Sequence, residues 1–295
     1  MNNQPLIVIT GPTASGKSGL ALDLAEHYSG EIICADSRTV YIGMDIGTAK
    51  PNQAEQARVP HHLLDVVEPG ERFTAVDFQR LARLAIDAIQ ARGKLPFVVG
   101  GTGLYIDALV REYEWPEASN NGDKFATYEA LTLVELQAMI KALQLSLPTI
   151  PLNKRHLIAT LLRRGQSGVK RDEPDANTHV VAITTDMDVL KRRIRTRAEA
   201  MFAGGVLEEA AELANRYGER SEAMTGNIYP LLQAVLHGKM TQNEAIERFV
   251  IKDRQLAKRQ LTYLKRLHYI QWLSLDEARN YLAAKIEHDA ANRAD

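Results

Sequence analysis

Residues 5–18 read PLIVITGPTASGKS, and this stretch decides the fold. Its first half, residues 6–10, is a continuous apolar and β-branched run, which is typical of a strand buried on both faces of a parallel sheet. Gly11 and Gly16 then bracket four residues, and the next two complete the pattern G-x-x-x-x-G-K-[ST]. An amphipathic run follows, so a strand, a glycine loop and a helix come in the order that a phosphate-binding loop requires.

The chemistry of this loop indicates a phosphate ligand. Glycines let successive backbone N–H groups turn toward an anion, and the amino terminus of the following helix adds a positive dipole end. Lys17 is expected to reach the terminal phosphates, and the Ser18 hydroxyl is expected to hold Mg²⁺. A chance match in a glycine turn is the weaker alternative, because few such matches lie between a buried strand and a helix. The predicted diphosphate- or nucleotide-binding residues are Gly11, Pro12, Thr13, Ala14, Ser15, Gly16, Lys17 and Ser18.

The composition is that of an ordinary globular protein. The 295 residues are 45% hydrophobic and 25% charged, and the formal net charge of −1 excludes a uniformly basic nucleic-acid coat but leaves room for a local basic face. Cys34 is the only cysteine, which excludes an intramolecular disulfide and a cysteine metal cluster. The sequence begins without a targeting pattern and contains no run of about 18 apolar residues, so we expect a cytoplasmic protein without a membrane partner.

Two further strand candidates end in polar or glycine-rich turns. Residues 31–35 read EIICA and are followed by Asp36, and residues 97–99 run into the turn at 100–103, GGTG. Because ligands bind beyond the carboxyl ends of strands in open α/β sheets, we expect Asp36 at the edge that carries the phosphate loop. Residues 38–60 show no clean periodicity, and a loop of that length in a compact domain is usually functional.

Strand and helix patterns alternate along most of the chain. Residues 63–67 and 180–184 give further strand candidates, and helix patterns separate the strands. We therefore predict the α/β class, with a P-loop NTPase-like parallel sheet that has helices on both faces. Long helix patterns close the chain, at residues 187–202, 206–217, 228–236, 244–267 and 276–286.

One interval departs from this alternation. The apolar periodicity weakens from residue 111 to about residue 151, where one helix is predicted at 133–145. Another helix is predicted at 154–164, and a glycine-broken link follows it. We expect a reduced helical insertion domain at 111–174, and a P-loop core that consists of residues 1–110 and 175–295 and includes the C-terminal helices.

The helix predicted at 244–267 is rich in basic residues. A face that is simply solvated is the ordinary interpretation of such a helix, and contact with phosphodiesters is the functional one. The basic residues that dominate its polar positions are Lys252, Arg254, Lys258, Arg259, Lys265 and Arg266.

Four separated segments together resemble one family, the tRNA dimethylallyltransferases or isopentenyltransferases. They are GPTASGKS at 11–18, the D-S…Y-x-G-M-D-I-G-T-A-K-P segment at 36–51, GGTGLY at 100–105 and LAKRQLTYLKR at 256–266. His61-His62-Leu63 and the L-x-x-R-I-x-x-R-x-x-x-M-x-x-x-G run at 190–205 are further matches. Apart from the insertion, the resemblance covers nearly the whole chain.

The resemblance implies transfer of a dimethylallyl group from dimethylallyl diphosphate to N6 of the adenosine 3′ of the anticodon. Arg197 matches the family's phosphate-contacting arginine, and Thr102 matches its substrate-contacting threonine. The exocyclic amine of adenine is a poor nucleophile, and we expect Asp36 to accept its proton as the general base. The catalytic residues expected on this basis are Asp36, Lys17, Thr102 and Arg197.

The resemblance also implies a tRNA partner and the cofactor Mg²⁺. A stacked target base must be extruded before an enzyme can reach it, and Tyr41 or Tyr105 could support it, although core packing is the ordinary role of each. His61 and His62 are expected to be structural. The expected tRNA-binding residues are Asp36, Ser37, Arg38, Thr39, Asp45, Thr48, Lys50, Thr102, Arg155, Lys258 and Arg259, with Lys154 beside Arg155 as a second contact in the insertion.

Some positions depart from the family pattern. Thr39 stands where the family often has Gln, and Asn227 and Tyr229 stand where it usually has Tyr and an acidic residue or Gln. Ala159 and Leu162 replace the Arg and Glu of an R-A-L-E stretch. These departures bear on tRNA affinity or stem–loop preference more than on the diphosphate chemistry.

Two other functions are compatible with parts of the pattern. A small-molecule or nucleoside kinase would share the phosphate loop and the sheet, but it needs an adenine pocket and lid arginines and does not generally combine the segments at 45–51 and 100–105. A non-catalytic RNA-binding module derived from the enzyme would bind tRNA without turnover. Nothing in the sequence indicates an obligate interface, so we expect a monomer.

Overall fold

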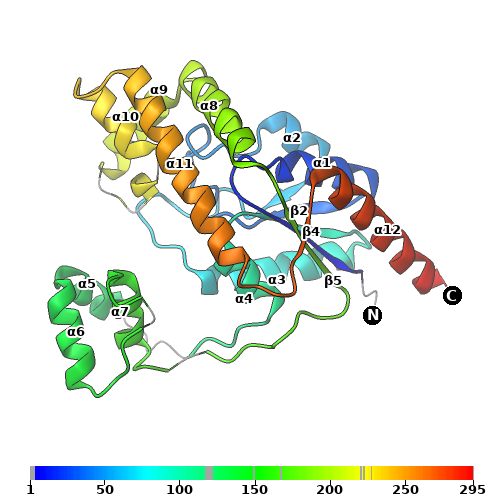
Figure 1. The fold of residues 1–295 in the computed structure, drawn as a ribbon, viewed down its shortest axis with the longest axis horizontal. Coiled ribbons are helices and arrows are strands. Elements are labelled where there is room, and N and C mark those ends of the chain that lie inside the picture. Colours follow the sequence, from blue (N-terminus) through cyan, green and yellow to red (C-terminus); the bar gives the residue numbers. More distant parts are fainter. Residues whose placement is uncertain are drawn as a thin grey trace. The chain divides into compact units, whose positions relative to one another are not determined.

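The computed structural model describes residues 4–116, 122–148, 150–166, 168–219, 221, 223–226 and 228–294. The chain divides into two units (Figure 1). Unit 1 comprises Met1–Val110 and Glu173–Asp295, and unit 2 comprises Arg111–Asp172. Among the described residues, no helix is both long enough and apolar enough to cross a bilayer.

Unit 1 is built on a six-stranded sheet with the order β3-β2-β4-β1-β5-β6. Every neighbouring pair of strands is parallel, as the alternation of strand and helix patterns predicts. The pairing is in register at the centre, where Ile9 of β1 lies opposite Val99 of β4 and Val181 of β5. The strands are β1 (Leu6–Thr10), β2 (Glu31–Cys34), β3 (His61–His62), β4 (Pro96–Gly100), β5 (Thr178–Ile183) and β6 (Gln271–Leu273).

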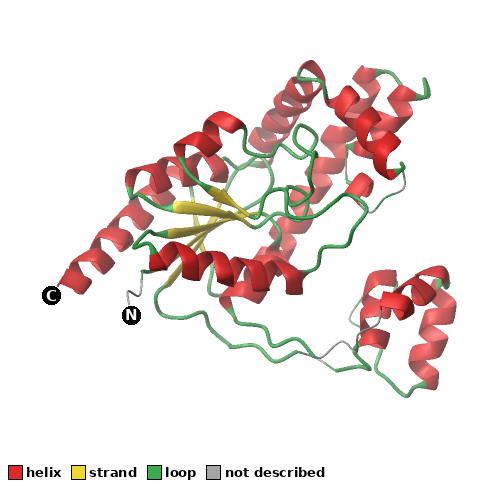
Figure 2. Ribbon diagram, turned by 180° about the vertical axis from the view of Figure 1, so that it is seen from behind, coloured by secondary structure: helices red, strands yellow, loops and turns green. Residues whose placement is uncertain are grey.

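The continuous apolar strands are explained by helices on both faces of the sheet (Figure 2). Because successive side chains of a strand point to opposite faces, Ile7 and Ile9 pack with α1 and α12, whereas Val8 packs with α3 and α4. All three side chains are fully buried. The helices that cover the sheet are α1 (Lys17–His27), α3 (Ala75–Ala91), α4 (Gly103–Val110) and α12 (Leu275–Ala294), and α2 (Gln53–Arg58) lies in the segment between β2 and β3.

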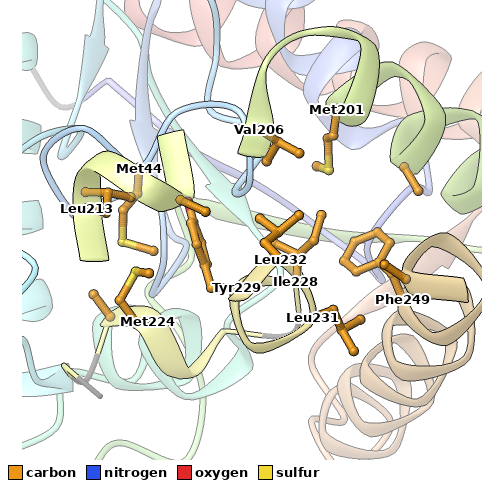
Figure 3. Packing of buried hydrophobic residues seen from close by; sticks show 14 of the residues in the cluster. Met44, Met201, Val206, Leu213, Met224, Ile228, Tyr229, Leu231, Leu232 and Phe249 are labelled. Atoms are coloured by element: carbon orange, nitrogen blue, oxygen red, sulfur yellow. The ribbon is translucent and has the colours of Figure 1, made fainter. Parts of the chain in front are cut away.

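A second hydrophobic core in unit 1 is formed by helices that follow β5. Figure 3 shows Met44, from the segment between β2 and β3, in one cluster with Leu213 and Tyr229. This core therefore ties the long segment after β2 to the C-terminal helices. The helices are α8 (Met187–Ala203), α9 (Val206–Tyr217), α10 (Tyr229–Leu236) and α11 (Gln242–Leu264), with a 3-10 turn at Ala223–Thr225.

Unit 2 is helical and has its own small core. It contains α5 (Gly122–Ala130), α6 (Leu133–Ala142) and α7 (Lys154–Leu162). Leu136, Ile140 and Leu157 are fully buried between these helices. Ala159 and Leu162, two of the departures from the family pattern, both lie on α7.

Four elements differ from the expectation. The third strand is the pair His61–His62 and not residues 63–67, because His61 and His62 pair with Ile32 and Ile33 while the chain turns at Leu63 and Asp65, both of which have positive φ. Helix α2 begins at a capping box of Asn52 and Glu55 inside the segment expected to be a loop. Strand β6 and helix α5 lie where no element was predicted.

Candidate active site

Three loops meet at one edge of the sheet because β2, β4 and β1 are neighbours. The phosphate loop follows β1, Asp36 follows β2 and the GGTG turn follows β4. The Thr102 N–H donates to Ala35 O at 3.2 Å, and the Ser37 N–H donates to the Thr102 hydroxyl at 3.1 Å. A Cβ on Gly100 would lie 2.0 Å from Ala35 O, so only glycine lets the second and third loops approach this closely.

The phosphate loop has the conformation of an anion-binding loop. Gly11 and Gly16 have φ values of 144° and 94°, and Ala14 between them has a φ of 62°. Helix α1 begins directly after Gly16 without a side-chain cap, so its first N–H groups are free to meet an anion. The buried Ser15 hydroxyl has no hydrogen-bond partner among the described residues. These N–H groups and this hydroxyl suit a bound phosphate, whose oxygens would accept their hydrogen bonds.

Lys17 and Arg197 place positive charge beside the phosphate loop. Lys17 donates to Pro12 O at 3.3 Å, and burial lowers its pKa to about 8. The carboxylate of Asp36 opposes this shift, the guanidinium of Arg197 adds to it, and Asp253 opposes it. Arg197 comes from α8 and donates from Nη2 to the Asp253 carboxylate of α11. A lysine and an arginine thus stand near the loop, as a diphosphate site requires.

Neighbouring helices hold the phosphate loop in place. Arg193 of α8 donates to Ser15 O at 3.1 Å and to Ala14 O at 3.3 Å. Gln260 of α11 accepts from the Thr13 N–H at 2.8 Å, and Asp253 accepts from the Thr13 hydroxyl at 3.4 Å.

A cavity of about 480 Å³ connects these groups. It is bounded by the phosphate loop, the turns after β2 and β4, the loop at 47–51, and residues of α8, α10 and α11. Of the residues predicted from the sequence, its lining includes Thr13, Lys17, Ser18, Asp36, Ser37, Arg38, Thr39, Thr48, Thr102, Arg197 and Arg259. The lining does not include Gly11, Pro12, Ala14, Ser15, Gly16, Asp45, Lys50 or Lys258.

Lys50 was expected to contact RNA, but its side chain points into the protein. Its side chain is 3% exposed, and its ammonium donates to Tyr41 O at 2.9 Å, Asp45 Oδ1 at 2.6 Å and Asp65 Oδ1 at 2.5 Å. An ammonium has three N–H donors, so these bonds use all of them. Lys50 therefore holds the loop from inside, whereas the Asp45 side chain remains 62% exposed.

The loop that contains Asp45 and Thr48 has a second anchor that sequence reasoning missed. The carboxylate of Glu209 in α9 accepts from the backbone N–H groups of Asp45 at 2.9 Å, Ile46 at 2.6 Å and Gly47 at 2.9 Å. Thr48 caps the same turn by donating its hydroxyl hydrogen to Met44 O at 2.6 Å. No motif around Glu209 marks it, because its role depends on a loop 162 or more residues earlier in the chain.

Arg38 and Thr39 lie beside Asp36 in different environments. The Arg38 N–H donates to Asp36 Oδ1 at 2.8 Å, and its guanidinium donates to Ala223 O at 3.3 Å. Thr39 is buried, and its hydroxyl has no hydrogen-bond partner among the described residues. Asn227, another departure from the family pattern, lies outside the described residues.

Helix α11 contributes more than the basic residues noted in the sequence. Phe249, Asp253, Leu256, Gln260 and Tyr263 all line the cavity. Their spacing of four, three, four and three residues places them on one helix face, and this spacing is the signal that could have found them. Lys258 and Arg259 are exposed. Arg155 and Lys154 lie on α7 of unit 2, where Lys154 donates to Glu129 O at 2.5 Å.

The remaining candidates have structural surroundings. His61 contacts Val59 O at 2.7 Å, and His62 contacts Glu31 Oε2 at 2.7 Å. Tyr105 stacks on Phe78 with ring centroids 4.5 Å apart, and Tyr41 is 3% exposed. Burial raises the pKa of the Cys34 thiol to about 12, so this cysteine is a neutral wall of the cavity.

Comparisons with known sequences give a consistent picture. A family model described as IPP transferase matches residues 39–267. The chain is 38% identical over 288 residues to the tRNA dimethylallyltransferase of Pelotomaculum thermopropionicum, and the match covers 92% of this chain and 91% of that protein. It is 36% identical over 302 residues to the tRNA dimethylallyltransferase of Geobacillus thermodenitrificans, with coverage of 96% and 94%.

The fold is similar to a solved structure of the same kind of protein. The crystal structure of the full-length tRNA isopentenylpyrophosphate transferase from Bacillus halodurans matches with a TM-score of 0.73 and 32% sequence identity. The match covers 99% of this chain and 100% of that chain.

Proposed function

The chain belongs to the IPP transferase family of tRNA dimethylallyltransferases, and from this premise we propose that it transfers a dimethylallyl group from dimethylallyl diphosphate to N6 of the adenosine 3′ of the anticodon in tRNA. The family assignment confirms the resemblance drawn from the sequence. The observation that carries the proposal is that Lys17, Asp36 and Thr102, which follow three neighbouring strands, line one cavity at the carboxyl ends of those strands.

The diphosphate end of the reaction uses the loop after β1. In the transfer, the bond between the allylic carbon and the diphosphate oxygen breaks, and negative charge develops on that oxygen. The loop N–H groups and the side chains of Lys17 and Arg197 are fixed donors for that charge, and donors fixed in advance stabilise it without reorganisation. Diphosphate leaves, and the adenine amine attacks the electron-poor allylic carbon.

The nucleophile end uses Asp36. As the new N6–carbon bond forms, the amine must lose a proton, and Asp36 is the half-buried carboxylate that lines the cavity two residues after the end of β2. Its Oδ1 accepts from the Arg38 N–H at 2.8 Å, which fixes the direction of the carboxyl group. Thr102 also lines the cavity and would hold the base or a phosphate by its hydroxyl.

Mg²⁺ fits the loop through one protein oxygen. Ser18 lies in the first turn of α1, and it lines the cavity beside Lys17. The described residues contain no group of three or more acidic, histidine or cysteine side chains that could bind a metal. Mg²⁺ usually keeps several waters and binds through substrate phosphates, so Ser18 together with the diphosphate oxygens would hold it. When bound, the ion neutralises charge on the leaving diphosphate.

The residues proposed to contact tRNA come from several separate segments of the chain. Ser37, Arg38, Thr48 and Arg259 line the cavity and would contact the extruded nucleotide and its neighbours. Lys258 and Arg155 would contact phosphates from α11 and from unit 2. We assign Lys50 to holding the loop and not to a direct RNA contact. Every group that carries the chemistry comes from unit 1 of one chain, so the proposal requires no second copy.

The test is a reconstituted transfer reaction. The purified chain is incubated with dimethylallyl diphosphate, Mg²⁺ and unmodified tRNA, and the digested nucleosides are analysed by mass spectrometry. We expect one dimethylallyl group on the adenosine 3′ of the anticodon, and none when Lys17→Ala replaces the parent chain. Phosphoryl transfer from ATP to a small acceptor without any prenyl transfer would contradict the proposal.

A further inference from the structure

A buried carboxylate stands inside the diphosphate site, where only cations are expected. Asp253 of α11 is 3% exposed and lines the same cavity as Lys17 and Arg197. It forms an ion pair with Arg197 Nη2 and accepts from the Thr13 hydroxyl at 3.4 Å. A carboxylate beside a bound diphosphate costs electrostatic energy, so its position calls for a compensating role.

We propose that Asp253 is a positioning residue, which orients the Arg197 guanidinium toward the leaving diphosphate through the hydrogen bond to Nη2. This inference rests on the proposed function, because it names the residue that sets the geometry of the diphosphate clamp.

The surroundings of Arg197 support this role. A guanidinium has five N–H donors in a fixed fork, so one bond to Asp253 leaves the others for phosphate oxygens. The Nε–H of Arg197 is buried and has no acceptor among the described residues. The guanidinium also lies 5.9 Å from the centre of the Phe249 ring, one helical turn before Asp253 on α11. Ring and carboxylate together restrict a long side chain that would otherwise sample many rotamers.

The contact with Thr13 extends the same arrangement to the phosphate loop. Asp253 and Gln260 are seven residues apart on α11, so they lie on one face, and both bind Thr13. One helix face thereby sets the position of the arginine and of the loop against which it acts.

The experiment measures binding of inorganic pyrophosphate, in the presence of Mg²⁺, by calorimetry on the full chain. Asp253→Ala removes the acceptor, and we expect it to weaken pyrophosphate binding at least about tenfold, the effect of losing a hydrogen bond to a charged group. Asp253→Asn keeps an acceptor oxygen, and we expect its affinity to stay within about threefold of the parent chain. In an Arg197→Ala background, Asp253→Ala should cause no further loss, because the arginine through which it acts is gone.

Each alternative has its own result. Equal losses in Asp253→Ala and Asp253→Asn would mean that the charge matters and not the hydrogen bond, and this would overturn the proposal. Unchanged or tighter binding by Asp253→Ala would overturn it too, as would a full additional loss in the Arg197→Ala background. Melting temperatures of all variants separate loss of folding from loss of binding. Glu247→Gln, on an exposed position of the same helix, is the matched control. If the parent chain binds pyrophosphate but transfers no prenyl group, the proposed function fails while this test remains valid.

Discussion

The Tyr229 hydroxyl donates a hydrogen bond to the Glu209 carboxylate at 2.8 Å. Burial raises the pKa of Tyr229, and the adjacent Glu209 charge and hydrogen bond raise it further, so the phenol stays neutral and remains a donor. A Cβ on Gly47 would lie 2.7 Å from the Tyr229 hydroxyl, so the loop at 45–47 rests directly on this ring. The pair joins α9 and α10 to the segment after β2, and Tyr229 itself lines the cavity.

Glu209→Ala removes the acceptor of three loop N–H groups and of the Tyr229 hydroxyl. We expect the loop at 45–50 to become mobile, because solvent must then satisfy those donors. The predicted result is faster amide hydrogen exchange at residues 45–47 and weaker tRNA binding, with pyrophosphate binding nearly unchanged. Glu208→Ala, at the neighbouring position, is the control. Exchange rates equal to those of the parent chain would remove Glu209 from this role.

Lys50→Met tests the inward orientation of Lys50. The variant removes the ammonium that donates to Tyr41 O and that pairs with Asp45 and Asp65. Since those two carboxylates are 62% and 45% exposed, water can solvate them, and we expect a loss of about 1–3 kcal/mol for the buried carbonyl and not the larger cost of a buried unpaired charge. Urea denaturation measures this loss. A variant that is as stable as the parent chain but binds tRNA more weakly would instead support a direct contact between Lys50 and RNA.

Glu31 makes stability depend on pH in the acid range. Burial alone raises the pKa of this carboxyl, but hydrogen bonds from Arg92, His62 and Lys94 outweigh it and hold the pKa at about 2, below the usual 4.5. A depressed pKa contributes stability that is present above the unfolded value and is lost as the pH falls from about 4.5 toward 2. The difference in urea midpoint between the parent chain and Glu31→Gln should therefore be large at pH 7 and shrink below about pH 4.5. A difference that is constant from pH 7 to pH 3 would contradict the role of the Glu31 charge.

The sheet and the phosphate loop could be predicted because their signals are local. A buried strand shows as a continuous apolar run, and the glycine pattern fixes the loop that follows β1. Strand β6 has only three residues, and its partner β5 lies far earlier in the chain, so no local pattern marks it. The strand lies at His61–His62 because these residues pair with β2, whereas the local apolar pattern had predicted it at residues 63–67.

The site was predictable at its motifs and not at its supports. Asp36, Lys17 and Thr102 follow strands at a predictable edge and do line one cavity. Lys50 lies in a motif segment but turns inward, and nothing in the local sequence distinguishes an inward lysine from an outward one. Asp253 and Gln260 were not predicted, because the basic residues between them dominated the interpretation of the helix. Their spacing, which places them on one helix face, could have been recognised in the sequence.

Lys258 and Arg259 on α11 provide a test of the tRNA-binding surface. Replacing both with Gln should weaken tRNA binding and reduce the slope of log affinity against log salt by about one for each phosphate that the variant no longer neutralises. Arg80→Gln with Arg83→Gln, at exposed positions of α3, removes the same charge elsewhere. Filter binding between low and moderate salt measures the slope. Equal slopes for the α11 variant and the parent chain would mean that Lys258 and Arg259 are solvent-exposed without contacting tRNA.

Asp36 carries the most specific chemical prediction. Asp36→Asn keeps an oxygen that can accept from the Arg38 N–H, so the turn after β2 should survive, while the side chain can no longer take a proton. We expect the single-turnover rate of prenyl transfer to fall by roughly 10²–10⁴-fold, the range for loss of a general base. Pyrophosphate binding should change little, because Asp36 acts on the amine and not on the leaving group. Asp87→Asn, an exposed carboxylate on α3, is the matched control. An unchanged single-turnover rate in Asp36→Asn, with tRNA and donor both saturating, would show that another group accepts the proton, and would leave Asp36 as a residue that only shapes the turn.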